Sequence, residues 1–282
     1  MDLALRDKVV WITGASGGIG RAIAEVFAAE GAQLALHGNR SLDGLKAWVD
    51  AQPWKKRALL LKADVRDSSA LERCADDIRE RFGRIDICAA NAGLWPPGDH
   101  PLEELPVERL RDTIEVNLLG ALFTARAFLG CLRRTGPRSD GHGSALVFTG
   151  STAGRFGERD HVDYAASKAG LVGVVRSLKN EIVRSDPYGR VNLVEPGWTV
   201  THMARPALEV PGAVERATRT MALRQLARAT DIARTVCWLS SPTAATHVTG
   251  QIITVAGGME GRLLWDEADV DRTAILARLD RD

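Results

Sequence analysis

The stretch Val9-Val-Trp-Ile-Thr-Gly-Ala-Ser-Gly-Gly-Ile-Gly20 joins a short apolar run to a glycine-rich turn, and a helical pattern follows at once. From residue 18 to residue 30, apolar side chains recur at Ile19, Ile23 and Phe27 on one helical face. Glycines let the backbone approach phosphate groups, and the free N–H groups at a helix N-terminus favour negative charge. We therefore interpret the turn as a pyrophosphate site, with a purely structural turn as the alternative. The expected contacts are Gly14, Ser16, Gly18, Ile19 and Gly20.

The rest of the chain alternates β-branched or apolar runs with longer segments of helical period, which is typical of repeated βα units around a parallel sheet. The seven expected strands cover residues 9–13, 33–37, 58–61, 85–89, 144–149, 190–194 and 252–255. Asp67 is expected to open the third helix and Gly83 to end it. The pattern predicts a Rossmann-like, doubly wound α/β fold with helices on both faces of the sheet. One domain is expected over residues 1–258, followed by an extension over 259–282.

The composition restricts the kinds of partner. Basic and acidic residues number 37 and 36, so the net charge of +1 creates no field that attracts nucleic acid or an anionic membrane. No apolar run reaches membrane-spanning length and the N-terminal residues do not resemble a signal peptide, so we expect a cytoplasmic protein. Four widely spaced cysteines form no CxxC pair, which predicts buried thiols and no metal site. They are Cys74, Cys88, Cys131 and Cys237.

Tyr164 and Lys168 stand at i and i+4 of a predicted helix, so both side chains lie on one face. A free phenol has a pKa near ~10, and a close ammonium is expected to lower the pKa of Tyr164 by favouring the phenolate. Tyr164 would then give a proton to a carbonyl oxygen or take one from an alcohol. Ser151 ends the fifth strand, where open α/β sheets bind ligands, and would hold the substrate oxygen. Taken alone, this tyrosine–lysine spacing is common on ordinary helices.

Several motifs occur in the same order as in a known family. They are the TGxxxGIG turn at residues 13–20, Asp64-Val65, Asn91-Ala92-Gly93, Asn117, Ser151, Tyr164-x-x-x-Lys168, and Pro196-Gly197 with Thr201. Over residues 6–258 the chain resembles the short-chain dehydrogenase/reductase family, and within it the single-domain members similar to 3-oxoacyl-ACP reductases and pteridine reductases. One departure is Ala256, which stands where the family commonly has an aspartate.

The resemblance implies roles for these residues. The implied catalytic tetrad is Asn117, Ser151, Tyr164 and Lys168. Within it, Lys168 would hold the nicotinamide ribose, and Asn117 would anchor a water that connects Lys168 to solvent. Asp64 would meet the adenine ring. The other implied cofactor contacts are Val65, Asn91, Ala92, Gly93, Pro196, Gly197, Thr199 and Thr201.

The end of the second strand decides between the two nicotinamide cofactors, because a carboxylate there binds the ribose 2′-OH and an arginine accommodates a 2′-phosphate. The segment His37-Gly-Asn-Arg-Ser41 has no acid before Asp43. Asn39, Arg40 and Ser41 are therefore expected to favour NADP(H) over NAD(H), as in the similar run of pteridine-reductase-like members. Two observations leave NAD(H) open: Gly17 stands where many NADP-preferring relatives carry a second basic residue, and Ser41 would also serve as a helix cap.

The loops expected above the nicotinamide cover residues 94–100, 153–157 and 198–223. Their candidate substrate contacts are Trp95, Arg155, Phe156, His161, Trp198 and Met203. A mainly apolar lining favours a ring-containing or otherwise apolar carbonyl or alcohol. Such aromatic residues also often only fill space, and His161 would either be solvated or cap its loop, or line the substrate entrance. A serine hydrolase is disfavoured because Ser151 has no G-x-S-x-G setting.

Beyond residue 258, the extension carries the apolar cluster Leu263-Leu-Trp265 and an expected amphipathic helix near its end. A soluble monomer would expose this cluster, so we expect it to pack on a neighbouring subunit or over the substrate site. The resemblance implies a homotetramer or homodimer.

The leading functional hypothesis is reversible hydride transfer between NADP(H) and a carbonyl/secondary alcohol pair, with ketone reduction as the physiological direction. A second enzymatic hypothesis is an NAD-dependent alcohol or dihydrodiol dehydrogenase. A hypothesis of a different class is a catalytically silent sensor that binds the nucleotide.

Overall fold

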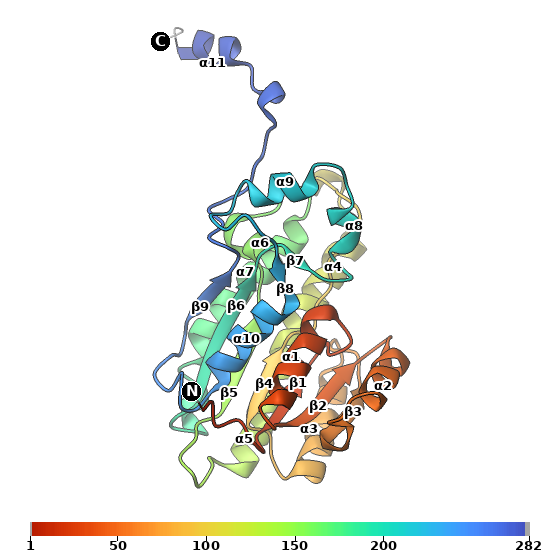
Figure 1. Ribbon diagram of the computed structural model, residues 1–282, viewed down its shortest axis with the longest axis vertical. Coiled ribbons are helices and arrows are strands. Elements are labelled where there is room, and N and C mark those ends of the chain that lie inside the picture. Colours follow the sequence, from red (N-terminus) through yellow and green to blue (C-terminus); the bar gives the residue numbers. More distant parts are fainter. Residues whose placement is uncertain (1, 280–282) are drawn as a thin grey trace.

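A computed structural model of the chain describes residues 2–279. Its centre is a seven-stranded sheet in which every pairing is parallel, in the order β3-β2-β1-β4-β5-β6-β9 (Figure 1). The strands are β1 (Val9–Ile12), β2 (Gln33–Gly38), β3 (Ala58–Lys62), β4 (Ile87–Ala90), β5 (Ala145–Thr149), β6 (Arg190–Pro196) and β9 (Ile252–Val255). The predicted Rossmann-like α/β fold is confirmed, and the expected strand ends differ from the observed ones by no more than two residues.

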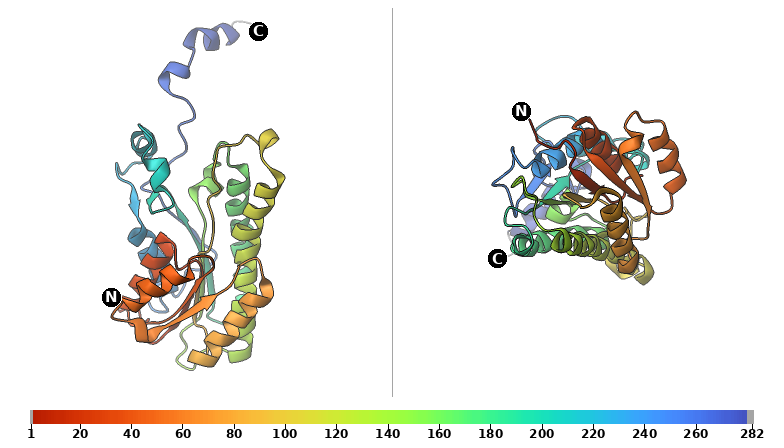
Figure 2. Two further views of the ribbon diagram at one scale, coloured as in Figure 1. Left: turned by 90° about the vertical axis from the view of Figure 1, so that its right-hand side faces the viewer. Right: turned by 90° about the horizontal axis from the view of Figure 1, so that it is seen from below.

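Helices cover both faces of this sheet (Figure 2). One face packs against α1 (Gly18–Ala29), α2 (Leu42–Asp50) and α10 (Ala229–Ser240), and the other against α3 (Ser68–Phe82), α5 (Gly120–Thr135) and α7 (Val162–Leu178). Side chains of a strand point alternately to the two faces. In β1, accordingly, Val9 and Trp11 belong to the core under α3, α5 and α7, whereas Val10 and Ile12 belong to the core under α1 and α10. All four are buried, so β1 is buried on both sides, as a central parallel strand must be.

The strand order reverses beside β1. The chain runs from β1 to β2 and β3 on one side, then returns across β1 to β4 on the other. The connections that follow β1 and β4 therefore diverge and leave a crevice at the carboxyl ends of the two strands, which is where doubly wound sheets bind ligands. The glycine turn follows β1 and Asn91 follows β4, so both predicted cofactor segments lie at this crevice.

A continuous helical segment of 29 residues, Val107–Thr135, is apolar and long enough by composition to span a membrane. It consists of α4 (Val107–Ile114), one π-helical turn (Glu115–Leu119) and α5, and it packs against α3 and α7. Phe128 and Leu132 on it are completely buried in the core under the sheet. The segment is therefore a core helix of the layered α/β fold.

The ends of α3 match their predicted signals. Asp67 accepts a hydrogen bond from the Ala70 N–H at 3.0 Å as N-cap, and Gly83 ends the helix with a φ of +85°. The remaining α-helices and strands lie at the carboxyl side of the sheet. They are α6 (Thr152–Phe156), β7 (Thr199–Val200), α8 (Arg205–Leu208), α9 (Ala213–Thr218), β8 (Ala227–Arg228) and α11 (Arg272–Leu279), with β7 and β8 paired in a small second sheet.

The C-terminal extension leaves the body at the same side as the glycine turn and projects away from it, with α11 at its far end (Figures 1 and 2). Met259 is buried, and Arg262 holds the base of the extension through an ion pair of 3.0 Å with Glu158. Beyond it, Leu263, Leu264 and Trp265 are exposed in the described chain. That this cluster packs on another subunit or over the site stays a prediction.

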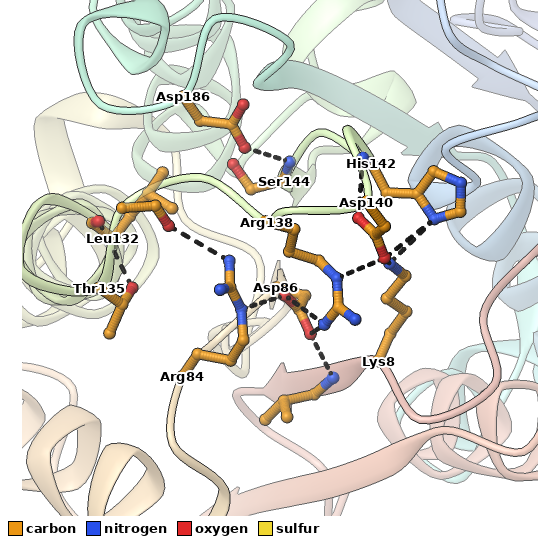
Figure 3. A network of polar contacts seen from close by, with 12 residues as sticks. Lys8, Arg84, Asp86, Leu132, Thr135, Arg138, Asp140, His142, Ser144 and Asp186 are labelled. Carbon is orange, nitrogen blue, oxygen red and sulfur yellow. Dashed lines mark hydrogen bonds and ion pairs between the residues drawn. The ribbon is translucent and has the colours of Figure 1, made fainter.

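The opposite, amino end of the sheet carries a partly buried cluster of charges (Figure 3). Lys8 Nζ lies 3.0 Å from Asp140 Oδ2 and 3.0 Å from His142 Nδ1. Arg138 bridges Asp140 and Asp86, at 2.9 Å and 3.1 Å. The cluster ties the long polar loop between α5 and β5 to the start of β1, and it contains no catalytic-tetrad residue.

Candidate active site

The glycine turn after β1 is built so that backbone amides remain available. Gly14 has a φ of +66°, and a Cβ on Gly20 would overlap the Gly14 carbonyl oxygen, so both positions require glycine. Gly17 is the N-cap of α1 and offers no capping side chain, and the first turn of α1 contains no acidic residue. Ser16 and Ile19 are half-buried in the same turn. The N-terminus of α1 thus presents unpaired N–H groups and a favourable dipole to an anion.

His37 fixes this turn, a role that was not predicted. Its ring is buried, Nε2 lies 3.0 Å from the Ala63 carbonyl oxygen, and the Gly14 N–H donates to Nδ1 at 3.4 Å. Because Ala63 offers only an acceptor, Nε2 carries the proton and Nδ1 accepts. Burial lowers the pKa of His37, which keeps the ring neutral in this arrangement. A buried histidine in a strand carries no distinctive sequence signal.

The segment that follows β4 is hydrogen-bonded to the same turn. Asn91 Nδ2 donates to the Thr13 carbonyl oxygen at 3.1 Å, while Thr13 Oγ1 accepts from the N–H groups of Asn91 and Ala92 at 3.1 and 3.2 Å. A Cβ on Gly93 would lie 3.1 Å from Asn117 Oδ1 and 3.2 Å from Lys168 Nζ. The Asn-Ala-Gly segment therefore joins the predicted phosphate turn to the predicted tetrad, with no room for a larger residue at position 93.

The adenosine side of the predicted cofactor site contains a strong ion pair. Arg66 binds Asp64 with two hydrogen bonds of 3.0 and 2.6 Å and reaches Asp112 at 2.6 Å. The hydrogen bonds from Arg66, assisted by Asn39, lower the pKa of Asp64 to about 2. Asp64 is thus a carboxylate held by Arg66. This ion pair was not predicted, although the two residues are only two positions apart in the sequence.

Arg40 and Ser41 directly follow Asn39, whose side chain hydrogen-bonds to Asp64, and both are exposed. Ser41 is the N-cap of α2, yet its hydroxyl makes no capping hydrogen bond. Its side chain is therefore not committed to the helix cap that was the alternative interpretation. Val65 is buried, and its side chain would collide with a Cβ on Gly120, so it packs between β3 and the start of α5.

Tyr164 and Lys168 lie on one face of α7, as predicted. Lys168 Nζ lies 2.9 Å from the Thr149 carbonyl oxygen at the end of β5 and 5.8 Å from the centre of the Tyr164 ring. Ser151 follows β5 as the N-cap of α6, where its Oγ accepts from the Ala153 N–H at 3.1 Å. The structure thus brings Ser151, Tyr164 and Lys168 together at the carboxyl end of β5.

The expected direction of the Tyr164 pKa shift is wrong. Burial raises the pKa of Tyr164, and the hydrogen bond with Ser151 only partly offsets that rise. Burial also lowers the pKa of Lys168 to about 8. The reason is that a buried site disfavours both the phenolate and the ammonium, and this desolvation is the largest influence on the pKa of each group. Tyr164 is consequently a protonated phenol at neutral pH.

Asn117 lies in the π-helical turn between α4 and α5. Its Oδ1 accepts from the Leu94 N–H at 2.8 Å, and its Nδ2 donates to the Leu94 carbonyl oxygen at 3.0 Å and to Ser167 Oγ at 3.2 Å. A π-turn adds one residue to a helix and often marks a functional position. Here it directs a buried amide onto the loop that follows β4. The implied water beside Asn117 stays a prediction.

Trp95 and His161 form one wall beside the phenol. The Trp95 ring centre lies 4.7 Å from that of Tyr164 and 4.1 Å from that of His161. His161 is buried and occupies the N-cap position of α7, although its side chain makes no capping hydrogen bond. Its Nε2 lies 3.0 Å from Asp99 Oδ1 and its Nδ1 accepts from Arg109 at 2.9 Å, so both ring nitrogens are engaged. His161 thus supports the loop carrying Trp95, and Arg109 was missed because it lies on a different helix.

The other candidate substrate residues lie further out. Phe156 and Trp198 pack on a small apolar cluster with Met221 and Met259. Arg155 donates to Thr254 Oγ1 on the edge strand β9 at 3.1 Å. Met203 is exposed. None of these contacts joins them to Tyr164, in contrast to Trp95.

The segment after β6 closes the predicted nicotinamide side. The Gly197 N–H donates to the Val255 carbonyl oxygen at 3.0 Å, and Thr199 Oγ1 donates back to the Gly197 carbonyl oxygen at 2.9 Å. The chain turns here after Pro196, the last residue of β6. Thr201 then covers the glycine turn, because its side chain would lie 3.0 Å from a Cβ on Gly18. Residues from β1 and β6 thus approach each other across the crevice.

Metal-binding chemistry finds no support in the described residues: within 2–279, no group of three His, Cys, Asp or Glu side chains is arranged to hold an ion. The four cysteines are buried free thiols.

Residues 14–260 match the protein-family profile described as enoyl-(acyl carrier protein) reductase. The chain is 34% identical over 252 residues to the 3-oxoacyl-[acyl-carrier-protein] reductase FabG of Escherichia coli, covering 89% of this chain and 97% of that protein. It is 32% identical over 262 residues to the L-rhamnose 1-dehydrogenase (NAD(P)(+)) of Azotobacter vinelandii, covering 91% and 98%. A crystal structure of a short chain dehydrogenase from Burkholderia cenocepacia in complex with NADP superimposes with a TM-score of 0.78 at 30% identity, covering 90% and 98%.

Proposed function

The chain belongs to the short-chain dehydrogenase/reductase family, and we propose that within it the protein is an NADP(H)-dependent ketone reductase. Membership makes it an oxidoreductase that acts on a carbonyl/alcohol pair with NAD(P). The single observation that carries the finer proposal is the protonated, half-buried Tyr164 beside Lys168, at the crevice that the glycine turn opens.

The residues at the crevice fit a nicotinamide dinucleotide. The α1 N-terminus has neither an acid nor a capping side chain in the way of a pyrophosphate, and Gly14 and Gly20 allow close approach. On the side of β5, Lys168 would hold the nicotinamide ribose and Thr201 would close over the phosphates. When bound, the cofactor supplies a hydride to the carbonyl carbon or accepts one from the alcohol.

The chain's own residues supply the proton and the positioning. Tyr164 keeps its proton at neutral pH and would donate it from its hydroxyl to the carbonyl oxygen of the substrate. Ser151 would hold that oxygen beside the phenol, and Lys168 would favour the phenolate left after the transfer. A raised pKa of the tyrosine favours donation over abstraction of a proton, which supports reduction as the direction at neutral pH.

NADP(H) is proposed over NAD(H) because no carboxylate side chain stands at the end of β2 before Asp43, while Arg40 and Ser41 are exposed there. The guanidinium of Arg40 offers a planar pair of donors that suits a 2′-phosphate. The similar Burkholderia cenocepacia structure contains NADP, which supports this choice. The alternative is an NAD-dependent alcohol or dihydrodiol dehydrogenase, and tighter binding of NADH than NADPH would favour it.

We further propose that the working form is a homodimer or homotetramer in the cytoplasm. The exposed cluster Leu263-Leu264-Trp265 is the supporting observation, since large apolar side chains side by side usually mark a contact. Light scattering during size-exclusion chromatography tests this: we expect an oligomer for the full chain, and a smaller species when Leu264 and Trp265 are both changed to serine. A monomeric full chain would refute the proposal.

The function is tested by following the absorbance of reduced nicotinamide while the protein meets a panel of cyclic and acyclic ketones and secondary alcohols, with NADP(H) and NAD(H) in parallel. We expect turnover with NADPH, and a loss of at least ~100-fold in Tyr164→Phe, since general acid catalysis contributes about that much or more. NADPH binding by Tyr164→Phe should be retained. Binding without turnover of any substrate would instead favour the nucleotide-sensor hypothesis.

A further inference from the structure

Arg109 on α4 is the most fully engaged side chain near the site. A guanidinium has five N–H donors, and here each has an acceptor. Nε donates to Asp163 Oδ2 at 3.0 Å; Nη1 donates to the carbonyl oxygens of Pro97 and Gly98 at 3.0 and 2.6 Å. Nη2 donates to His161 Nδ1 at 2.9 Å and to Asp163 Oδ1 at 3.3 Å. One side chain therefore joins α4, the loop after β4 and the start of α7.

The carboxylate partner of Arg109 directly precedes Tyr164. The Asp163 side chain is fully buried and also accepts from Thr113 Oγ1 at 2.9 Å. Burial would raise the pKa of Asp163, but the hydrogen bonds from Arg109 and Thr113 outweigh burial and lower it. The ion pair is therefore charged on both sides and fixes the first turn of α7, which carries the phenol.

His161 connects Arg109 to Trp95. Because His161 Nδ1 accepts from Arg109, its proton lies on Nε2, which donates to Asp99 Oδ1 at 3.0 Å. The imidazole ring lies against the Trp95 ring, and Trp95 meets the Tyr164 ring edge-on at an interplanar angle of 65°.

We propose that Arg109 is a positioning residue that holds Trp95 against Tyr164 and thereby selects substrates with a flat apolar group next to the carbonyl. Trp95 is 37% exposed, so one part of its ring remains open to a ligand beside the phenol. A ring-bearing ketone would pack on this surface, whereas a small acyclic ketone would not reach it. This proposal rests on the proposed ketone reductase function and names the class of substrate for the same site.

Arg109→Lys tests the proposal, because lysine keeps the positive charge but cannot present donors to all the acceptors that surround a planar guanidinium. The matched control is Arg111→Lys, at an exposed arginine on the same helix. For a cyclic ketone that the wild type reduces, we expect Arg109→Lys to raise KM at least ~10-fold and to change kcat less than ~threefold. For a small acyclic ketone both constants should change less than ~threefold. An equal loss of kcat on both ketones would overturn the proposal.

A double-mutant cycle with Trp95→Phe separates positioning from general destabilisation. If Arg109 acts through Trp95, Arg109→Lys should have little further effect on KM for the cyclic ketone in the Trp95→Phe background. Effects that multiply independently would overturn the proposal. NADPH affinity should be unchanged in every variant, since no contact of Arg109 reaches the glycine turn.

A readout without turnover keeps this test independent of the proposed function. The difference in fluorescence between wild type and Trp95→Phe isolates the emission of Trp95. Arg109→Lys should shift that difference spectrum to longer wavelength, because Trp95 would leave the Tyr164 and His161 rings for water, and Arg111→Lys should not. An unchanged difference spectrum would refute the positioning role even if no ketone were turned over. A shift without any ketone turnover would instead leave the positioning role intact and refute only the reductase proposal.

Discussion

Lys8 and Lys168 are buried to the same extent, 4% and 5% exposed, at opposite ends of one sheet, yet their surroundings differ. Lys8 donates to the Asp140 carboxylate and to His142, and these contacts offset much of the cost of its burial. Lys168 donates to a single carbonyl oxygen, and its pKa falls to about 8. Burial alone therefore does not decide what a lysine does. A buried charge with a counter-ion holds segments of the chain together. The pKa of a buried lysine without a counter-ion falls towards neutrality, which suits proton transfer.

The same contrast extends to the two ends of the sheet. At the amino end, Asp86 accepts from the Val9 N–H at 2.9 Å, from Arg84 at 2.6 Å and from Arg138 at 3.1 Å. At the carboxyl end, the amides at the start of α1 have no capping side chain. The charged groups at the amino end are paired with one another, whereas the carboxyl end leaves backbone N–H donors for a ligand.

The largest effect is expected for Lys168→Met. Turnover should fall about 100- to 10,000-fold, because the phenolate formed after proton transfer loses its ammonium. Stability at pH 7 should rise by about 1 to 3 kcal/mol. The reason is that the ammonium is disfavoured in the folded state at every pH below about 8, and this cost disappears between pH 8 and 10.5, the pKa of a lysine in water.

Steady-state rates and urea unfolding measure the two quantities. Lys8→Met is the matched control, for which we expect lower stability and unchanged kcat. If Lys168→Met were destabilised as much as Lys8→Met, the distinction between the two lysines would fail.

Asp86→Asn should come second, with a loss of stability of about 3 kcal/mol, because two arginines and a backbone N–H would face a neutral amide in a buried setting. Urea unfolding at pH 7 measures it. The kcat and NADPH affinity of the folded variant should equal those of the wild type. Reduced NADPH affinity would show that the two ends of the sheet are energetically coupled.

The pH dependence should distinguish the two directions of the reaction. Reduction needs a protonated Tyr164 and a charged Lys168, so its kcat/KM should decline above about pH 8. Oxidation of the corresponding alcohol needs the phenolate, so its rate should increase over the same range. Profiles from pH 6 to pH 10 check this, at roughly constant ionic strength. A reduction rate that rises above pH 8 would contradict the assignment of Tyr164 as the proton donor.

The smallest expected effect concerns His142→Ala. Lys8 would keep Asp140 as its partner, and His142 is partly exposed, so stability should fall by less than about 1 kcal/mol. Thermal unfolding measures the change. A loss as large as that of Asp86→Asn would mean that His142, rather than Asp140, supplies the main compensation for Lys8.

Local patterns were enough to predict the sheet, the glycine turn and the face shared by Tyr164 and Lys168, since each depends on residues within one or two elements. The pKa of Tyr164 could not be predicted in the same way. It depends on burial beneath Trp95, which lies 69 positions earlier in the chain. Only the tertiary structure shows that desolvation outweighs the neighbouring ammonium.

Arg109 escaped prediction for a related reason. Its acceptors belong to residues 97–98 and 160–163, which are separated from it in sequence and approach it only when α4 and α7 pack together. The direction of the C-terminal extension was equally beyond local patterns. Arg66, in contrast, lies two residues from Asp64 across a turn, and its ion pair could have been proposed.

The π-helical turn Glu115–Leu119 determines whether this helical segment can lose a residue and keep its side chains in place. An α-helix advances about 100° per residue, so the extra residue sets the rotational phase between α4 and α5. Deleting one residue here would restore a regular helix and turn the whole of α4 by about that angle. Arg109 would then point away from residues 97–98 and Asp163. A single-codon deletion between 115 and 119 should therefore not be tolerated, even though the shortened helix would itself be more regular.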